Sequence, residues 1–389
     1  MARIAIVFLV LLTLSTAGEA RAESLPLQGS YENCGPATNE EMCLERLDEL
    51  HGAGITVVLN YWAWSASPAQ VIRYADRAKA LEMQLIWPAL PEEAPERSYP
   101  LLAEGCGCEG TALIQYAIRL VRGHPATWGY YVGEEVLYLP SPAAMAVHSY
   151  AATVHRADRV KPRLYVTWGG WGPSAMRRLL NPFADDAEFL GADYYPVGVN
   201  KSDGVSGAGA VAKATKAVAD EHGRDTVAVL QAFSWASEPT LAPRGDHRWP
   251  TVSEMRRMRN LSYLRGDPAI ILWFDYYFIK PPGTSNMKHL DDLTAALRAP
   301  YPVKVQKLGR NAQRLHWQQS RPGAVILSYR QAGQTHRRRL SGAGGRFAIS
   351  RLELRRGPVR LRIRTVGRMR LRSYTARVRF RVNSHGAAT

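Results

Sequence analysis

Two neighbouring carboxylates, Glu134 and Glu135, end a segment that begins at His124 and otherwise consists mainly of apolar, aromatic and glycine residues. This composition predicts a buried strand. A carboxylate at the C-terminal end of such a strand can give a proton to a bound substrate or take one from it. Asp193 and Asp275 also follow strand-like runs. We therefore take Glu135, Asp193 and Asp275 as the candidate catalytic residues.

Aromatic and amide side chains gather near the predicted strand ends. Flat rings can stack on the apolar faces of sugars, while amides and carboxylates hydrogen-bond to hydroxyls. The predicted substrate-binding residues are Asn60, Trp62, Trp64, Glu134, Trp171, Tyr195, Gln231, Trp235 and Tyr277. The alternative is that aromatic rings fill the core, and we favour it for Trp128 and Trp273, which lie inside their predicted strands.

Eight strand-like runs alternate with helix-like stretches, which is typical of a parallel α/β fold. The predicted strands are Leu25–Gly29, Ile55–Tyr61, Gln84–Pro88, Trp128–Glu134, Arg163–Trp168, Phe189–Tyr195, Thr226–Phe233 and Ile270–Tyr276. This number and order favour a (β/α)8 TIM barrel over residues 23–300, whose active site would lie at the C-terminal ends of the strands. An open doubly wound sheet is the alternative, but no glycine-rich phosphate loop follows the first strand.

Side chains alternate between the two faces of a strand, which predicts the direction of each candidate. In the segment that ends at Glu135, glycines share its parity and bulky apolar residues share that of Glu134. We therefore expect Glu135 to face the barrel axis and Glu134 to face the helices or the rim. The same rule groups Asp193 with Gly191 on the inner side.

The segment from His124 to Glu135 resembles the fourth-strand motif of retaining (β/α)8 glycoside hydrolases, in which His-Pro precedes a Gly-aromatic-aromatic strand and Gly-Asp-Glu-Pro. Here Glu134 replaces the Asp and Val136 replaces the Pro. Ala192-Asp-Tyr-Tyr-Pro196 is similar to a sixth-strand end in the same proteins. The resemblance implies a carbohydrate substrate, with Glu135 as general acid/base.

The resemblance also implies a carboxylate nucleophile at the end of strand seven, where this chain has Gln231. A glutamine cannot act as that nucleophile. Glycoside hydrolysis normally needs two carboxyl groups, so the second would be Asp193, Asp275 or Glu238, of which we favour Asp193. The two hypotheses are a glycoside hydrolase and a carbohydrate-binding pseudoenzyme that has kept the cleft.

Other chemistries find little support. The ten histidines include no H-x-H or H-E-x-x-H pair, and neither a P-loop nor a G-x-S-x-G elbow is present. The sequence therefore predicts no metal and no cofactor.

Residues 1–22 have a charged start, a short apolar run and an A-x-A pattern, which is typical of a signal peptide and predicts a secreted or periplasmic protein. Cys34, Cys43, Cys106 and Cys108 then favour disulfides over a metal site. A Cys106–Cys108 bridge would close a small strained ring, so pairing across the two clusters is at least as plausible.

Residues 301–389 carry 20 Arg and 2 Lys against a single acid, Glu353. Short alternating runs predict a small all-β sandwich that loosely resembles fibronectin type III or immunoglobulin-like domains. In Val359–Thr365 and Ala376–Val382 every second residue is arginine or polar. Because so many like charges repel one another, we expect an anionic partner, such as an acidic polysaccharide or an envelope surface. Few aromatic residues lie among the arginines, so nucleic acid is disfavoured.

Overall fold

The computed structural model describes residues 25–89, 95–198, 204–234, 247–280, 287–299 and 301–302, and beyond them the seven strands between 304 and 382. Four features of the sequence analysis lie outside these residues: the predicted signal peptide, Trp235, Glu238 and Glu353. Within the described residues, no helix combines the length and the apolar character needed to cross a membrane.

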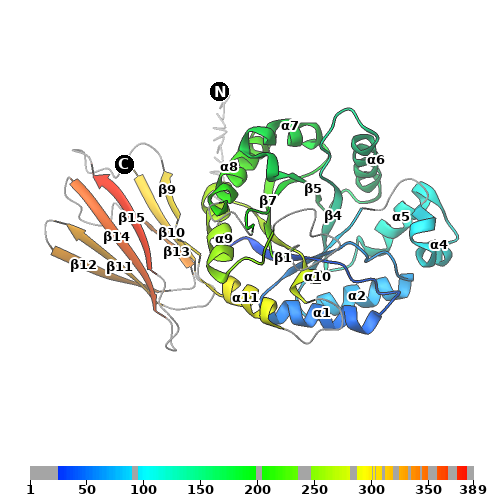
Figure 1. Ribbon diagram of the computed structural model, residues 1–389, viewed down its shortest axis with the longest axis horizontal. Helices are drawn as coiled ribbons and strands as arrows, with labels where there is room; N and C mark the ends of the chain where they lie inside the picture. The colour runs from blue at the N-terminus through cyan, green and yellow to red at the C-terminus, as the bar shows by residue number, and fades with distance from the viewer. Residues whose placement is uncertain are drawn as a thin grey trace, which may run out of the picture.

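Eight parallel strands close into a barrel in sequential order, so the predicted (β/α)8 barrel is confirmed (Figure 1). The strands are β1 (Leu27–Glu32), β2 (Val57–Asn60), β3 (Gln84–Trp87), β4 (Thr127–Glu134), β5 (Arg163–Trp168), β6 (Phe189–Tyr194), β7 (Asp225–Gln231) and β8 (Ile270–Phe274). Most of their residues are buried, as expected of parallel strands that are covered on both faces.

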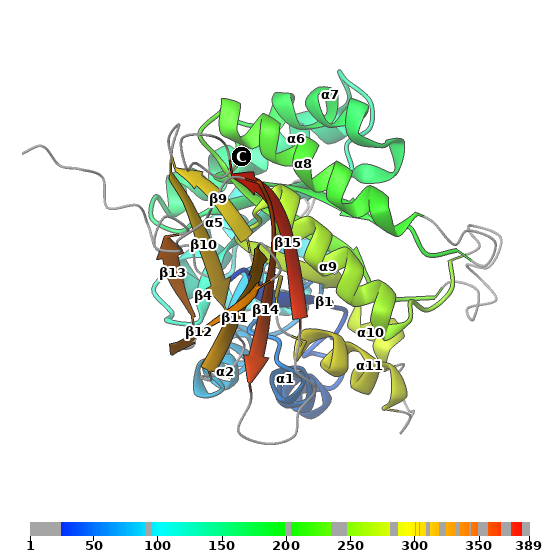
Figure 2. The ribbon, with the colours of Figure 1, turned by 90° about the vertical axis from the view of Figure 1, so that its left-hand side faces the viewer.

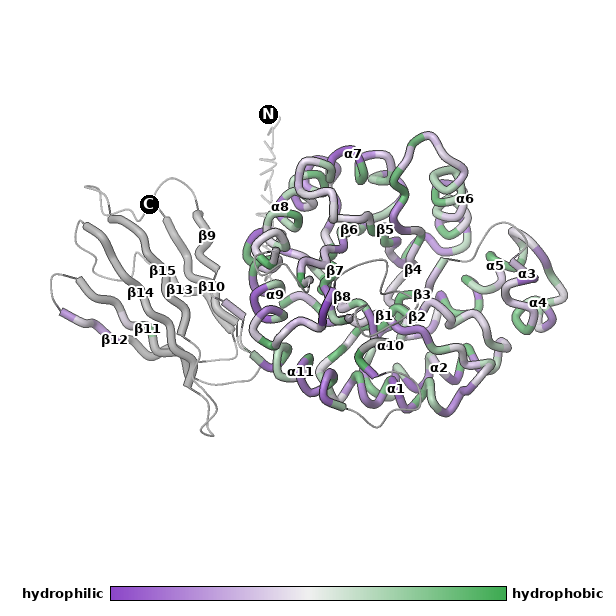
Figure 3. The backbone as a smooth tube through the Cα atoms, in the orientation of Figure 1, coloured by the Kyte–Doolittle hydropathy of each residue, from purple (hydrophilic) through white to green (hydrophobic). Residues whose placement is uncertain are grey.

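Helices surround the barrel. They are α1 (Glu40–Ala53), α2 (Pro68–Ala80), α3 (Pro95–Ser98), α4 (Pro100–Cys106), α5 (Gly110–Val121), α6 (Pro142–Ala157), α7 (Met176–Leu180), α8 (Val205–Glu221), α9 (Val252–Gly266), α10 (Tyr276–Ile279) and α11 (Lys288–Leu297). Ser67 and Thr251 form capping boxes at the starts of α2 and α9, which satisfies backbone N–H groups that have no partner within the helix. Hydrophobic and hydrophilic residues alternate along the helices (Figure 3).

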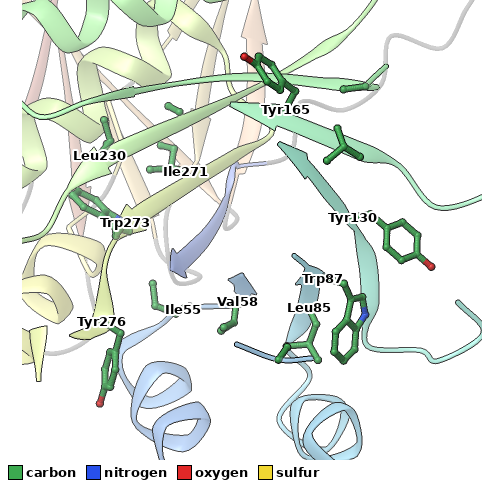
Figure 4. Packing of buried hydrophobic residues seen from close by; sticks show 14 of the residues in the cluster. Ile55, Val58, Leu85, Trp87, Tyr130, Tyr165, Leu230, Ile271, Trp273 and Tyr276 are labelled. Atoms are coloured by element: carbon green, nitrogen blue, oxygen red, sulfur yellow. The ribbon is translucent and has the colours of Figure 1, made fainter. Parts of the chain in front are cut away.

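The strand residues divide between two cores. One alternate set packs with the helices, and this set includes Val58, Leu85, Tyr130, Leu230 and Ile271 (Figure 4). The other set fills the barrel itself. Its members are Tyr31, Val57, Leu59, Ile86, Tyr131, Leu164, Val166, Val227, Val229, Ile270 and Leu272. The barrel is therefore packed along most of its length, as TIM barrels are, and open space begins at the strand ends.

The cysteines form two disulfides, Cys34–Cys43 and Cys106–Cys108. The prediction of disulfides is confirmed, and the alternative of pairing across the two clusters is wrong. The first bridge ties the segment that follows β1 to helix α1, directly beside the strand ends.

Seven antiparallel strands follow the barrel (Figure 2). They are β9 (Lys304–Leu308), β10 (Ala312–Gln318), β11 (Ala324–Gln331), β12 (Gln334–Ser341), β13 (Gly344–Ala348), β14 (Gly357–Val366) and β15 (Thr375–Val382). The strand order is β13-β10-β9 in one sheet and β12-β11-β14-β15 in the other. The sandwich, its resemblance to known domains and the boundary at residue 300 stay predictions.

Candidate active site

A cavity of about 850 Å³ opens at the C-terminal ends of the barrel strands. It is lined by Tyr31, Asn33, Tyr61, Trp62, Pro88, Ala89, Tyr99, Tyr131, Gly133, Glu134, Glu135, Val166, Trp168, Asp193, Tyr195 and Phe274. Three acids thus open into a space walled largely by aromatic rings. Of the sequence candidates, Glu134, Glu135, Asp193, Trp62 and Tyr195 meet here.

A β-bulge in β4 sets the direction of Glu134. Tyr131 pairs with Leu164 of β5, but the next pair is Gly133 with Tyr165, so Val132 is an extra residue. A bulge of this kind re-aims the side chains that follow it. Gly133 consequently faces α6, where a Cβ atom would lie 2.4 Å from Val147, and Glu134 faces the cavity. Of the two directions expected for Glu134, the helix side is wrong, because alternation across a regular strand does not hold here; the side chain is exposed at the end of the strand, where it lines the cavity.

Glu134 accepts two hydrogen bonds from tyrosine hydroxyls on the cavity wall. The Tyr61 hydroxyl lies 2.6 Å and the Tyr131 hydroxyl 2.8 Å from the same carboxylate oxygen. Burial raises the pKa of both tyrosines, so their hydroxyls keep their protons and act as donors. Burial likewise raises the pKa of Glu134, although these two hydrogen bonds oppose the shift.

Glu135 is brought to the cavity by a second backbone feature. Its φ is +49°, in the left-handed region that non-glycine residues rarely adopt. Its N–H still donates to the carbonyl of Val166 at 3.0 Å, which continues the pairing with β5. The left-handed turn directs the side chain toward Asp193, and the two carboxyl groups are hydrogen-bonded to each other.

Asp193 lies at the end of β6 and is only 2% exposed. One of its oxygens accepts a hydrogen bond from the Gly169 N–H at 2.8 Å, and Tyr195 is a further partner. Burial, followed by the contact with Glu135, raises the pKa of Asp193 well above its usual range. Two carboxyl groups in contact cannot both be charged at low cost, which favours the protonated form of Asp193.

Three predicted sugar-binding residues hold loops in place. All polar atoms of the Gln231 side chain are engaged, with its oxygen bonded to the Val197 N–H and its nitrogen to the carbonyls of Val197, Phe233 and Arg248. Asn60 bonds both backbone polar groups of Cys34. Neither residue lines the cavity. Asn60 faces away from the barrel axis, since its neighbours Leu59 and Val57 fill the interior.

The third of these residues, Trp64, is fully buried, stacks on Trp87 and donates to the carbonyl of Pro88. The alternative that this ring belongs to the core is therefore correct. Trp171 and Tyr277 are 38% and 37% exposed but do not line the cavity.

Asp275 is 1% exposed and also lies behind the cavity wall. It accepts a hydrogen bond of 2.6 Å from the side-chain nitrogen of Asn33. Asn33 does line the cavity, so Asp275 contributes by orienting that amide.

The sequence analysis missed Tyr31, Asn33 and Tyr131 as cavity residues, and it left Tyr61 and Trp168, which lie at predicted strand ends, out of the predicted substrate-binding residues. Tyr131 could have been found, because it shares the inner parity of Gly129 in the strand. Tyr61 and Asn33 each directly follow the last residue of a strand. The direction of a side chain there depends on the turn and not on the alternation along the strand. Among the described residues, no cluster of three His, Cys, Asp or Glu could hold a metal ion.

The packing at Gly133 predicts a stability effect. Gly133→Ala is expected to cost roughly 1–3 kcal/mol, because the new methyl overlaps Val147 in a packed layer. Urea unfolding would measure the loss. Gly123→Ala is the control, since a Cβ atom there has no neighbour within 4 Å. The double variant with Val147→Ala should lose less than the sum of the two single changes, and additive losses would contradict the overlap.

No family model and no curated protein matches this sequence. Solved structures share the fold, and two of them illustrate the similarity. One is a putative alpha-L-fucosidase from Bacteroides thetaiotaomicron, with 12% identity and a TM-score of 0.50, over 70% of this chain and 93% of that one. The other is a glycoside hydrolase family 5 protein from Bacteroides vulgatus, with 9% identity and a TM-score of 0.51, over 82% and 84%. The chain thus has a TIM-barrel fold that is also found in glycoside hydrolases.

Proposed function

We propose that this protein is an exported glycoside hydrolase that cleaves an oligosaccharide or polysaccharide by carboxylate acid/base catalysis. The observation that supports it most is the contact of Glu135 with Asp193, whose pKa is raised, beside a further cavity acid, Glu134. A protonated carboxyl group and a separate carboxylate are the two groups that this chemistry requires.

In this proposal Glu135 is the proton donor, because it opens into the cavity whereas Asp193 is buried in the wall. The proton of Asp193 passes to Glu135 and from there to the glycosidic oxygen as the C–O bond breaks. Both carboxyl groups are then charged, which is offset by the positive charge that develops on the sugar and, at Asp193, by the hydrogen bond from the Gly169 N–H. The water that later attacks the sugar returns a proton to the pair.

In this proposal Glu134 is the second acid, the charged carboxylate that acts beside the proton donor. The Glu135 and Asp193 carboxyl groups touch each other, so no sugar ring fits between them, and glycosidase pairs are separated by roughly 5 Å or more. Glu134 faces the same cavity from the neighbouring position and is held by two tyrosine hydroxyls. In its charged form it would stabilise the positive charge that develops on the sugar.

The basic C-terminal sheet supports an anionic partner, an acidic polysaccharide or an envelope surface. In the four-stranded sheet, Arg360 is paired with Arg379 and with Arg330, and Arg362 is paired with Arg377. Directly opposed positions share one face of a sheet, and like charges placed there destabilise it. A polyanion bound to this face would offset the repulsion.

This role predicts a steep dependence on salt. Binding of the full chain to a soluble acidic polysaccharide should weaken strongly between about 0.1 and 1 M salt, over which the Debye length falls from about 10 Å to about 3 Å. Fluorescence anisotropy with labelled pectate would measure this dependence, with carboxyl-reduced pectate as the control. Binding that is unchanged by salt would contradict a charge-based interaction.

The direct test of the proposed function is the release of reducing ends from a panel of neutral and acidic glycans. Wild-type protein and the Glu45→Gln control, which alters an exposed acid on α1, should cleave the same glycan. Glu135→Gln should cleave it at least about 10²-fold more slowly, which also excludes a contaminating hydrolase. Equal cleavage by Glu135→Gln would refute the role of Glu135.

A carbohydrate-binding pseudoenzyme is the second candidate, and one observation favours it. The end of β7 carries Gln231, whose side chain is wholly used to hold loops, so no acid enters the cavity from that strand among the described residues. Glycans that bind equally to wild type and Glu135→Gln, with no turnover by either protein, would establish this candidate.

A further inference from the structure

Three aromatic rings, Trp168, Trp171 and Tyr138, adjoin one another from the cavity outward, and we call them the aromatic shelf. The ring centroids of Trp168 and Trp171 lie 5.5 Å apart, those of Trp171 and Tyr138 lie 6.5 Å apart, and each pair meets edge to face, at 67° and 72°. Trp168 ends β5 and lines the cavity, Trp171 ends the short helix η1 (Gly169–Trp171), and Tyr138 lies between β4 and α6. Gly169 also bonds to Asp193, so the shelf begins beside the candidate catalytic acids.

The two outer rings of this aromatic shelf are exposed to solvent. Trp171 is 38% exposed and Tyr138 is 73% exposed. Single exposed rings are common, but adjoining rings at the edge of a cavity mark a binding surface. Tyr and Trp suit such a place because each presents a flat apolar body and a polar group.

The positively charged side chain of Arg178 lies over one ring of this shelf. The guanidinium carbon of Arg178 is 4.7 Å from the ring centroid of Trp171, and one of its terminal nitrogens donates to the carbonyl of Leu137 at 3.4 Å. Its neighbour Arg177 is paired with Glu221. Within the described part of the chain, no carboxylate lies within ion-pair distance of Arg178.

We propose that the aromatic shelf binds a carboxylate-bearing sugar unit, a uronic acid, of an acidic oligosaccharide whose adjoining unit occupies the cavity. Stacking fixes the plane of the Arg178 guanidinium on Trp171, and its remaining N–H groups can then hold a carboxylate by two parallel hydrogen bonds. This inference rests on the proposed function for the position of the adjoining unit, and it narrows the substrate class from any glycan to an acidic one.

The position of Arg178 distinguishes this site from the arginines of the C-terminal sheet. Those arginines would attract any polyanion along its length. The shelf instead combines one cation with an apolar surface, so it recognises a sugar ring and a single carboxylate together. An affinity measured on the whole protein would mix the two contributions, and the test therefore needs a readout at single residues.

Oxidative footprinting, read residue by residue by mass spectrometry, provides that readout. The probes are short oligosaccharides of pectate, alginate and hyaluronate, each with its carboxyl-reduced form as the matched neutral ligand. We expect at least one acidic oligosaccharide to protect Trp171 and Tyr138 from oxidation. Half-maximal protection by the acidic ligand should need a concentration about two- to fivefold lower than half-maximal protection by its reduced form. This is the range expected for a surface ion pair.

The variant Arg178→Gln should abolish this preference while the neutral ligand protects as before. Glutamine can still donate to the carbonyl of Leu137, so the loop is retained. Arg177→Gln, next to it in sequence, should keep the preference. Equal protection by acidic and reduced ligands, or a preference that survives Arg178→Gln, would overturn the inference.

Footprinting needs no turnover, so the two proposals can fail separately. Protection of Trp171 without any hydrolysis would support the acidic-sugar site and refute the proposed hydrolase activity. Hydrolysis of a glycan without protection of Trp171 by any acidic probe would support the hydrolase activity and refute the acidic-sugar site.

Discussion

Glu135→Gln is expected to lower kcat for the cleaved glycan by about 10²- to 10⁴-fold, the usual contribution of a positioned general acid. Asp193→Asn is expected to cause a smaller loss with a distinct pH signature. In the wild type Asp193 loses its proton only as pH rises through a pKa raised above the usual range. The activity should therefore persist to higher pH than a lone carboxyl would allow.

The Asp193→Asn substitution would remove this arrangement, because an amide donates to the Glu135 carboxylate and carries no charge. Because the raised pKa of Asp193 is then absent, the basic limb of kcat/KM should move toward acid. The acidic limb reports Glu134, whose pKa is raised by burial, and it should stay in place. A pH profile of both variants beside Glu45→Gln measures these shifts, and a basic limb unchanged by Asp193→Asn would disprove the role of Asp193 as the source of the proton.

Arg46→Met is expected to destabilise the fold by about 3–5 kcal/mol, because it leaves a buried carboxylate without its partner. Arg46 donates to Glu32 at 2.7 Å, and the two side chains are 6% and 1% exposed. Glu32 ends β1 and accepts from the N–H of Asn33, which lines the cavity. The free energy of unfolding in urea would measure the loss.

The sign of the pH dependence follows from Glu32. Burial raises its folded-state pKa despite the opposing effect of Arg46, so the protonated form is favoured on folding and its stabilising contribution is lost as pH rises. Removing Arg46 raises that pKa further. The loss in Arg46→Met should therefore be largest at neutral pH and shrink as pH falls toward the ordinary range of glutamate.

The double variant Glu32→Gln with Arg46→Met is the control for a buried charge. It removes the carboxylate as well, and the Gln oxygen can still accept from the Asn33 N–H. It should recover much of the lost stability at neutral pH. A double variant as unstable as Arg46→Met at every pH would show that packing around Arg46, and not the charge of Glu32, causes the effect.

The barrel could be predicted because its strands are apolar runs of regular length. Arg163–Trp168 has the predicted bounds, and the other barrel strands differ by up to three residues at an end. Alternation also placed Asp193 and Gly191 on the inner side, where Asp193 lines the cavity. These features depend on local composition, which a single sequence contains.

The rest of the site depends on backbone geometry that composition does not reveal. The extra residue Val132 and the left-handed Glu135 bring both neighbouring acids to the cavity. Asn60 and Gln231 have the right chemistry for a sugar, but both are committed to backbone groups of loops distant in sequence. The number of cysteines predicted disulfides. It could not predict which cysteines pair, because pairing depends on the distances between them in the fold.

The bulge in β4 also has a consequence for how this protein can change over generations. On a regular strand, the side chains of consecutive acids would point to opposite faces, so only one of the two would reach the cavity. Loss of the codon for Val132 would restore a regular strand in which Glu134 is still opposite Val166 and faces the cavity. A substitution that straightened β4 without shortening it would instead turn Glu134 toward α6, so the direction of this acid depends on the bulge being kept or removed as a whole residue.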